Sequence, residues 1–124
     1  MAKVITIRDD PAVMSERDLF VTETGGFDTH QDLEGTNAGL FAGYDLAINE
    51  FANEMKAQGI WNSVTVVTVS EFGRTLTSNG LGTDHAWGGH HTVLGGGISG
   101  GQILGNYPED LTEAPTSLNI GRGR

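Results

Sequence analysis

The run of β-branched residues at 63–70 (SVTVVTVS) constrains the fold more than any other part of this sequence. Val and Thr side chains suit strands, and the run is too apolar on both faces for an exposed hairpin. It therefore predicts a buried central strand. The segment 18–24 (DLFVTET) predicts a second strand, which ends at Gly25-Gly26.

A helix is predicted between these two strands, from Leu40 to Gln58. Its apolar residues recur at helical spacing and form one stripe, and Gly59 supplies the stop. Strand, helix and strand in this order predict a βαβ unit with parallel strands and a right-handed crossover. The sequence thus predicts an α/β fold. Residues 2–8 fit either a strand or the end of a helix. The stripe comprises Phe41, Tyr44, Ile48, Phe51, Ala52 and Met55.

The connection from Arg74 to His91 has no helical periodicity and therefore provides no crossover helix. A chain that leaves the sheet at one edge and stays there must enter its next strand from that same edge. A strand at 92–94 that joins the sheet is therefore predicted to run antiparallel. The chain holds 19 glycines, many in pairs, and these indicate tight turns and close backbone approaches.

Polar side chains follow both predicted strands of the βαβ unit. The first strand ends in a segment with Asp28 and His30, and the second ends in one with Glu71 and Arg74. Because sites form at the carboxyl ends of parallel strands, these side chains are expected to converge. Asp28 and His30 point to the same side if the segment is extended, so both can reach one metal ion. Arg74 is a candidate clamp for a tetrahedral anion.

The remaining histidines lie in a second glycine-rich segment, as Asp84-His85 and His90-His91. Adjacent Asp84 and His85 diverge in an extended chain, which indicates either two metal ions or one ligand with a supporting neighbour. His90 and His91 do not easily bind one ion together, so one of them is expected to be structural. Without cysteine, the ligands must be imidazole and carboxylate, which suit zinc, manganese or iron.

Each candidate also has a purely structural interpretation. Asp28 and His30 can stabilise a turn by hydrogen bonding, and Glu71 can cap a helix or pair with Arg74. Arg74 is more often a salt-bridge partner than an anion clamp.

The net charge of −9 argues against nucleic acid or an anionic membrane as a partner, since both require clustered Lys and Arg. It favours a cation. No apolar run approaches the length of about 20 residues that spans a bilayer, and the N-terminus has no secretory signal pattern. Localisation and oligomeric state stay open.

Four motifs together resemble the bacterial domain-of-unknown-function 1501 family. They are GGFDTH (25–30), SEFGRT (70–75), TDHAWGGHH (83–91) and VLGGGISGG (93–101), with further similarity at 103–111 and 120–124. That family is grouped with alkaline phosphatases and sulfatases. The resemblance implies an alkaline phosphatase-like, doubly wound α/β sheet. It also implies one or two divalent ions (zinc, manganese or calcium) held by Asp28, His30, Glu71, Asp84, His85 and His90 or His91.

The resemblance further implies a hydrolase that acts on small-molecule phosphate or sulfate esters. Members of the family are often exported. Such hydrolases use an early Ser or Thr nucleophile, which the motif positions place before Met1. Residues 1–124 are therefore expected to form one incomplete domain with a partial sheet, whose motifs lie at about 17–111. Two hypotheses for the function of this chain follow. It is either the metal-binding part of a hydrolase or a non-catalytic remnant that binds metal or partners without turnover. The available hydroxyls are Thr22, Thr24, Ser70 and Thr83.

Overall fold

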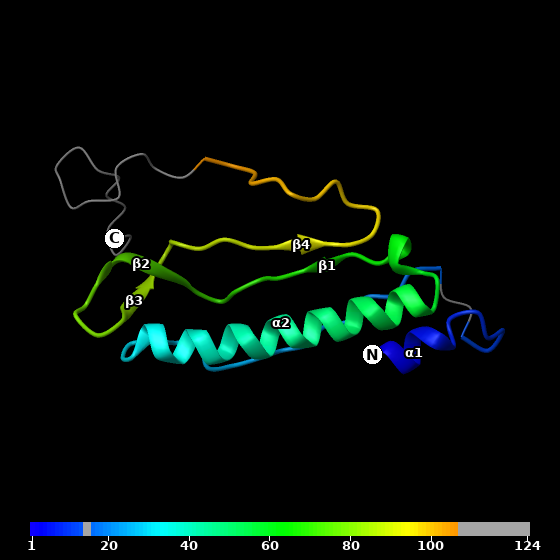
Figure 1. Cartoon of the computed structure of the whole chain (residues 1–124), viewed down its shortest axis with the longest axis horizontal. Coiled ribbons are helices and arrows are strands. Elements are labelled where there is room, and N and C mark those ends of the chain that lie inside the picture. The colour runs from blue at the N-terminus through cyan, green and yellow to red at the C-terminus, as the bar shows by residue number, and fades with distance from the viewer. Residues whose placement is uncertain (14–15, 107–124) are drawn as a thin grey trace.

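The computed structural model describes residues 1–13 and 16–106, and its main element is a long helix, α2 (Leu33–Ala57). The short helix α1 (Ala2–Thr6) lies beside the C-terminal end of α2 (Figure 1). There the Gln58 amide donates to the Thr6 hydroxyl at 3.0 Å. None of the described helices combines the length and apolar character needed to cross a bilayer.

The end of α2 follows the sequence prediction, but its start does not. Gly59 has a φ of +73°, and its N–H donates to the Lys56 carbonyl, while the Ile60 N–H donates to that of Met55. This pair of bonds is the Schellman motif, in which glycine tolerates the left-handed conformation. The predicted stop at Gly59 is therefore confirmed. The helix begins at Leu33, before the predicted start at Leu40. The apolar stripe did not mark these first turns, because they carry mostly polar residues and glycine.

The run at 63–70 forms only a short strand. After the 3₁₀ turn η1 (Trp61–Ser63), strand β1 (Val66–Val67) pairs antiparallel with β4 (Val93–Leu94). This is the direction expected for a strand at 92–94. The β1–β4 pair lies alongside α2 (Figure 1), and the Tyr44 hydroxyl of α2 is 3.2 Å from the Thr92 hydroxyl.

The prediction that 63–70 is buried on both faces is wrong in the described part of the chain. Val64 and Val66 are half-buried, whereas Val67 and Val69 on the opposite face are 55% and 84% exposed. The reason is that α2 lies along one side of a two-stranded sheet and no described element covers the other. The buried apolar core among the described residues consists of Ala52 and Met55.

The predicted strand at 18–24 has no regular secondary structure and joins neither of the described sheets. Leu19 and Val21 are 91% and 78% exposed. Strand propensity favours an extended backbone, but a strand also needs a neighbouring edge to which it can hydrogen bond. Both described sheets are two-stranded and antiparallel, so the parallel βαβ unit and the doubly wound sheet stay predictions.

The structure also contains a hairpin that the sequence analysis does not predict. Strands β2 (Gly73–Ser78) and β3 (Thr83–Ala86) pair antiparallel, with Gly73 opposite Ala86 and Ser78 opposite Thr83. The Asn79 side-chain oxygen closes the turn by accepting from the N–H groups of Leu81 (3.1 Å) and Gly82 (2.8 Å). Asn79-Gly80 is itself a hairpin signal, placed between two Thr-rich segments.

The β2–β3 hairpin packs against the segment that carries Asp28 and His30. The Thr83 N–H donates to the Thr29 carbonyl at 3.2 Å, and Thr29 is 4% exposed. Gly82 allows this approach. A Cβ at Gly82 would lie 2.6 Å from the carbonyl carbon of His30 and closer still to the Thr29 oxygen. The hairpin and the 28–30 segment therefore need glycine at this position.

We expect Gly82→Ala to destabilise the protein by about 1–3 kcal/mol, because the added methyl forces two backbone segments apart. The midpoint of urea unfolding measures the change. Gly89→Ala is the matched control, since a Cβ at Gly89 has open space around it. The control should stay within about 0.5 kcal/mol of the parent. Equal midpoints for both variants would contradict the close packing at Gly82.

Candidate metal centre

Three side chains from distant parts of the sequence meet at one end of the molecule. Asp28 Oδ1, His30 Nε2 and His85 Nε2 form a triangle in which each pair of atoms is 3.0 Å apart. Donor atoms around a metal ion with bonds of about 2.1 Å are spaced roughly 3.0–3.4 Å apart. Two imidazoles and one carboxylate also match known transition-metal ligand sets. The three side chains therefore fit a divalent ion in both spacing and chemistry.

Protons alone do not satisfy this triangle. Each Nε2 atom carries at most one proton and an ionised carboxylate carries none, so at most two protons serve three close pairs. At least one pair is then left with two acceptors, or two N–H groups, facing each other at 3.0 Å. A bound cation would accept all three lone pairs at once and remove this conflict.

The second ring nitrogen of His30 faces a carboxylate. His30 Nδ1 lies 3.1 Å from Asp84 Oδ1. Because an ionised carboxylate only accepts, a neutral His30 ring carries its proton on Nδ1 and its lone pair on Nε2, toward Asp28 and His85. Such a carboxylate–histidine pair commonly orients a metal ligand from behind. Asp84 therefore acts on His30, which agrees with the alternative of one ligand plus one supporting neighbour.

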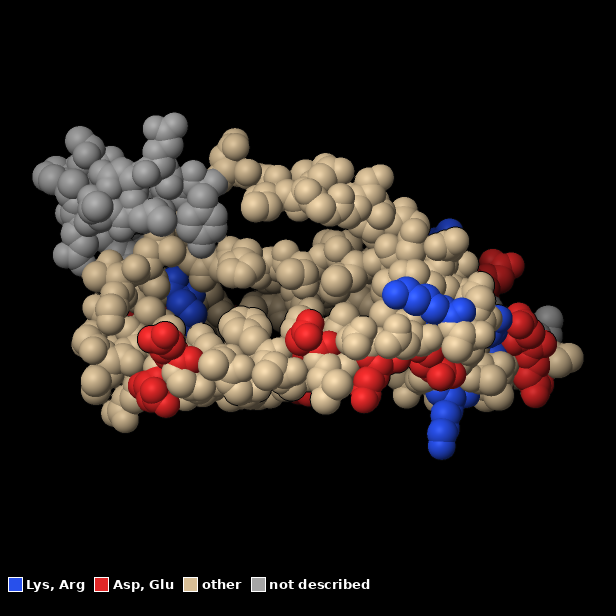
Figure 2. Space-filling model, in the orientation of Figure 1, with Lys and Arg blue, Asp and Glu red and all other residues tan. Residues whose placement is uncertain are grey.

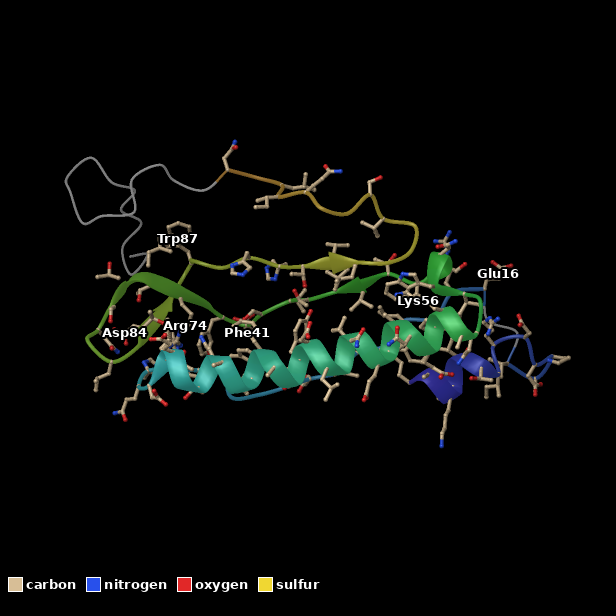
Figure 3. All side chains as sticks on the ribbon, viewed as in Figure 1. Glu16, Phe41, Lys56, Arg74, Asp84 and Trp87 are labelled. Atoms are coloured by element: carbon tan, nitrogen blue, oxygen red, sulfur yellow. The ribbon has the colours of Figure 1, made fainter. Side chains whose placement is uncertain are left out.

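Arg74 lies behind Asp28 rather than open to an anion. Its Nη1 donates to Asp28 Oδ1 at 2.6 Å, and its Nε and Nη2 donate to the Thr83 hydroxyl (3.0 Å) and carbonyl. Figure 3 shows Arg74 close to Asp84 at the β2–β3 end of the molecule. The guanidinium is the largest cause, and the hydrogen bond from His85 the next, of a lowered pKa for Asp28. Asp28 therefore stays ionised, and able to bind a cation, in mild acid.

The ring of His85 is held by stacking. Its centroid lies 3.5 Å from that of Phe72, with 28° between the planes, and 4.9 Å from that of His30. The side chains of Asp28, His30 and His85 keep 54%, 44% and 38% of their surface exposed. The centre is thus supported from behind and is accessible to a ligand from solvent.

The other predicted ligands lie outside the triangle. Glu71 is an exposed residue in the loop before β2, and His90 and His91 are exposed residues between β3 and β4. The structure therefore brings together Asp28, His30, Asp84, His85 and Arg74. Glu71, His90 and His91 stay predictions that the triangle does not include.

Sequence reasoning gave no supporting role to three residues that contact this centre, and it named Thr83 only as an available hydroxyl. Asn79 donates to Asp84 Oδ1 at 3.2 Å, Thr83 accepts from Arg74, and Phe72 stacks on His85. Only Asn79 carried a usable signal, through its Asn-Gly turn pattern. The positions of the other two depend on the register of an unpredicted hairpin.

We expect Arg74→Gln to raise the pKa of Asp28, because the variant removes the main stabiliser of its ionised form. A ¹³C NMR titration of the side-chain carboxyl measures this pKa. In the parent protein, the stability gained from ionised Asp28 is complete above the unfolded-state pKa. It declines as the pH falls through the lowered folded-state value, and this decline should shrink in the variant.

Arg8→Gln is the control for this titration. It removes the same charge beside α1, where Arg8 donates to the Ile5 carbonyl and lies 3.5 Å from Asp9. The control should leave the Asp28 titration unchanged. An Asp28 pKa that is the same in Arg74→Gln and the parent would show that Arg74 does not set it.

Comparison with known families gives a match over most of the chain. Residues 13–118 match the family model described as "Protein of unknown function (DUF1501)". No curated protein and no solved structure matches the sequence. The matched residues include all three residues of the triangle and cover most of the chain. The chain therefore belongs to the DUF1501 family.

Proposed function

We propose that Asp28, His30 and His85 bind one divalent cation, and that the chain is the metal-binding part of a hydrolase of phosphate or sulfate esters. The observation that carries the proposal is the triangle of three donor atoms at 3.0 Å, which protons alone do not satisfy. The second ion allowed by the sequence is not needed, because Asp84 supports His30 instead.

The charge around the centre supports a cation. With neutral imidazoles, the two carboxylates of Asp28 and Asp84 outweigh the single guanidinium of Arg74. The chain as a whole carries a formal charge of −9, and acidic side chains line the edge formed by α1 and α2 (Figure 2). Short-range and long-range fields therefore both favour a positive ion at this end of the molecule.

The ligand set also limits which ion is expected. Two imidazoles with one carboxylate suit zinc, manganese or iron. Calcium prefers six to eight oxygen ligands, so the two histidines argue against it. Of the three ions that the resemblance implies, the ligand types therefore favour zinc and manganese.

The hydrolase part of the proposal depends on the motif resemblance and on the open face of the centre. When bound, the ion would stabilise negative charge on a phosphoryl or sulfuryl oxygen. Arg74 uses Nη1, Nε and Nη2 on Asp28 and Thr83, so its first role is to hold Asp28 ionised and in place. We also propose that 18–24 and β1 belong to the doubly wound, alkaline phosphatase-like sheet that the resemblance implies.

A second candidate function is metal binding without turnover. Two of the candidate hydroxyls already have partners, since Thr83 accepts from Arg74 Nε and Ser70 donates to the Phe72 carbonyl at 3.1 Å. Thr22 and Thr24 are exposed on the segment 18–24, which joins neither of the described sheets. None of these hydroxyls is placed as a nucleophile against the triangle, which favours this alternative.

We expect the protein to bind one equivalent of Zn²⁺ or Mn²⁺, measured by calorimetry and by metal content after gel filtration. His30→Ala or His85→Ala should weaken binding by about 100-fold or more, since loss of a supporting residue alone typically costs 10–100-fold. His90→Ala and His91→Ala are matched controls, because each removes one histidine outside the triangle. Equal affinities in all four variants would contradict the proposed ligands.

Hydrolysis of aryl phosphate and aryl sulfate esters separates the two candidate functions. If the protein is a hydrolase, turnover should require added metal and should disappear in His85→Ala but persist in His91→Ala. Metal binding without turnover of either ester would favour the non-catalytic alternative. Turnover that persists in His85→Ala would exclude this centre as the active site.

A further inference from the structure

We infer that Asn79 is a positioning residue for this centre, which acts on His30 through Asp84. The inference rests on the proposed metal-binding function and extends it to a residue outside the four family-like motifs. Asn79 lies in the β2–β3 turn, yet its side chain contacts both Asp84 and the backbone of His30.

The orientation of the Asn79 amide is fixed by its contacts. Its oxygen accepts from the N–H groups of Gly82 at 2.8 Å and Leu81 at 3.1 Å. Two backbone donors identify that atom as the oxygen, so the other end must be the NH₂ group. This NH₂ group lies 3.2 Å from Asp84 Oδ1 and 3.3 Å from the His30 carbonyl oxygen.

Asp84 Oδ1 is therefore shared by two donors, the Asn79 amide and the His30 Nδ1–H. The amide holds the carboxylate oxygen opposite Nδ1, and the carboxylate keeps the proton on that nitrogen. The Nε2 lone pair then stays directed toward Asp28 and His85. Because Asp84 is 49% exposed, packing alone does not fix its carboxylate, and the Asn79 amide adds one of the hydrogen bonds that hold it.

The competing explanation is that Asn79 only closes the turn. Ser78 offers a direct comparison, because its hydroxyl also stabilises this turn, donating to the Gly82 carbonyl at 3.1 Å and accepting from the Gly80 N–H at 3.0 Å. In the described part of the chain, the Ser78 hydroxyl makes no hydrogen bond to Asp84. A pure turn function predicts similar effects of Ser78→Ala and Asn79→Ala on the centre.

A double-mutant cycle tests whether Asn79 acts through Asp84. The Kd for Zn²⁺ is measured by calorimetry in the parent, Asn79→Ala, Asp84→Ala and the double variant. We expect Asn79→Ala to weaken binding about tenfold in the parent, within the range for supporting residues, and less than about twofold when Asp84 is absent. Ser78→Ala should bind Zn²⁺ like the parent. Equal losses in both backgrounds, or no loss in either, would overturn the inference.

A measurement without metal keeps the inference separate from the proposed function. The ¹⁵N shifts of the His30 ring report its tautomer, and we expect the Nδ1–H form in the parent and in Ser78→Ala. Asn79→Asp keeps an oxygen for the turn but places a second carboxylate beside Asp84. It should shift the ring toward the other tautomer or broaden its signals. An unchanged His30 tautomer in this variant would overturn the inference even if the parent binds no metal.

Discussion

The contact between the β2–β3 hairpin and the 28–30 segment is the interaction on which the rest of the centre depends. The Thr83 N–H bonds to the Thr29 carbonyl, and Gly82 provides the space for the two backbones to approach. This contact places Asp28 and His30 against His85, which lies 57 and 55 residues further along the chain. Thr29 is buried between them, so its neighbours Asp28 and His30 both face outward to the triangle.

The centre is organised by hydrogen bonds and one ring contact behind its three side chains. Arg74 holds Asp28, Phe72 stacks on His85, and Asn79 together with Asp84 directs His30. These supports come mainly from β2, β3 and the turn between them. A single hairpin thus supplies one side chain of the triangle and most of the residues that position the other two, while the open side stays accessible to solvent.

Sequence reasoning predicted the pairing of Asp28 with His30 and the relevance of Arg74, Asp84 and His85, because these residues lie in short motifs. It expected Glu71 to join them through parallel strand ends, but the structure builds the triangle with His85 from β3. The difference arises because hairpin register is set by hydrogen bonding between segments with weak periodicity. Likewise Gly59 marked the helix end, whereas pairing of 18–24 depends on a neighbouring edge that local propensity does not specify.

The central claim is that one divalent ion binds to the three donor atoms at the β2–β3 end of the molecule. Anomalous diffraction from crystals soaked with Zn²⁺ or Mn²⁺ tests it most directly. The account predicts one strong peak in contact with Asp28 Oδ1, His30 Nε2 and His85 Nε2, with Asp84 still on His30 Nδ1. Anomalous density only at His90 and His91, or a soaked structure whose triangle holds no ion, would contradict it.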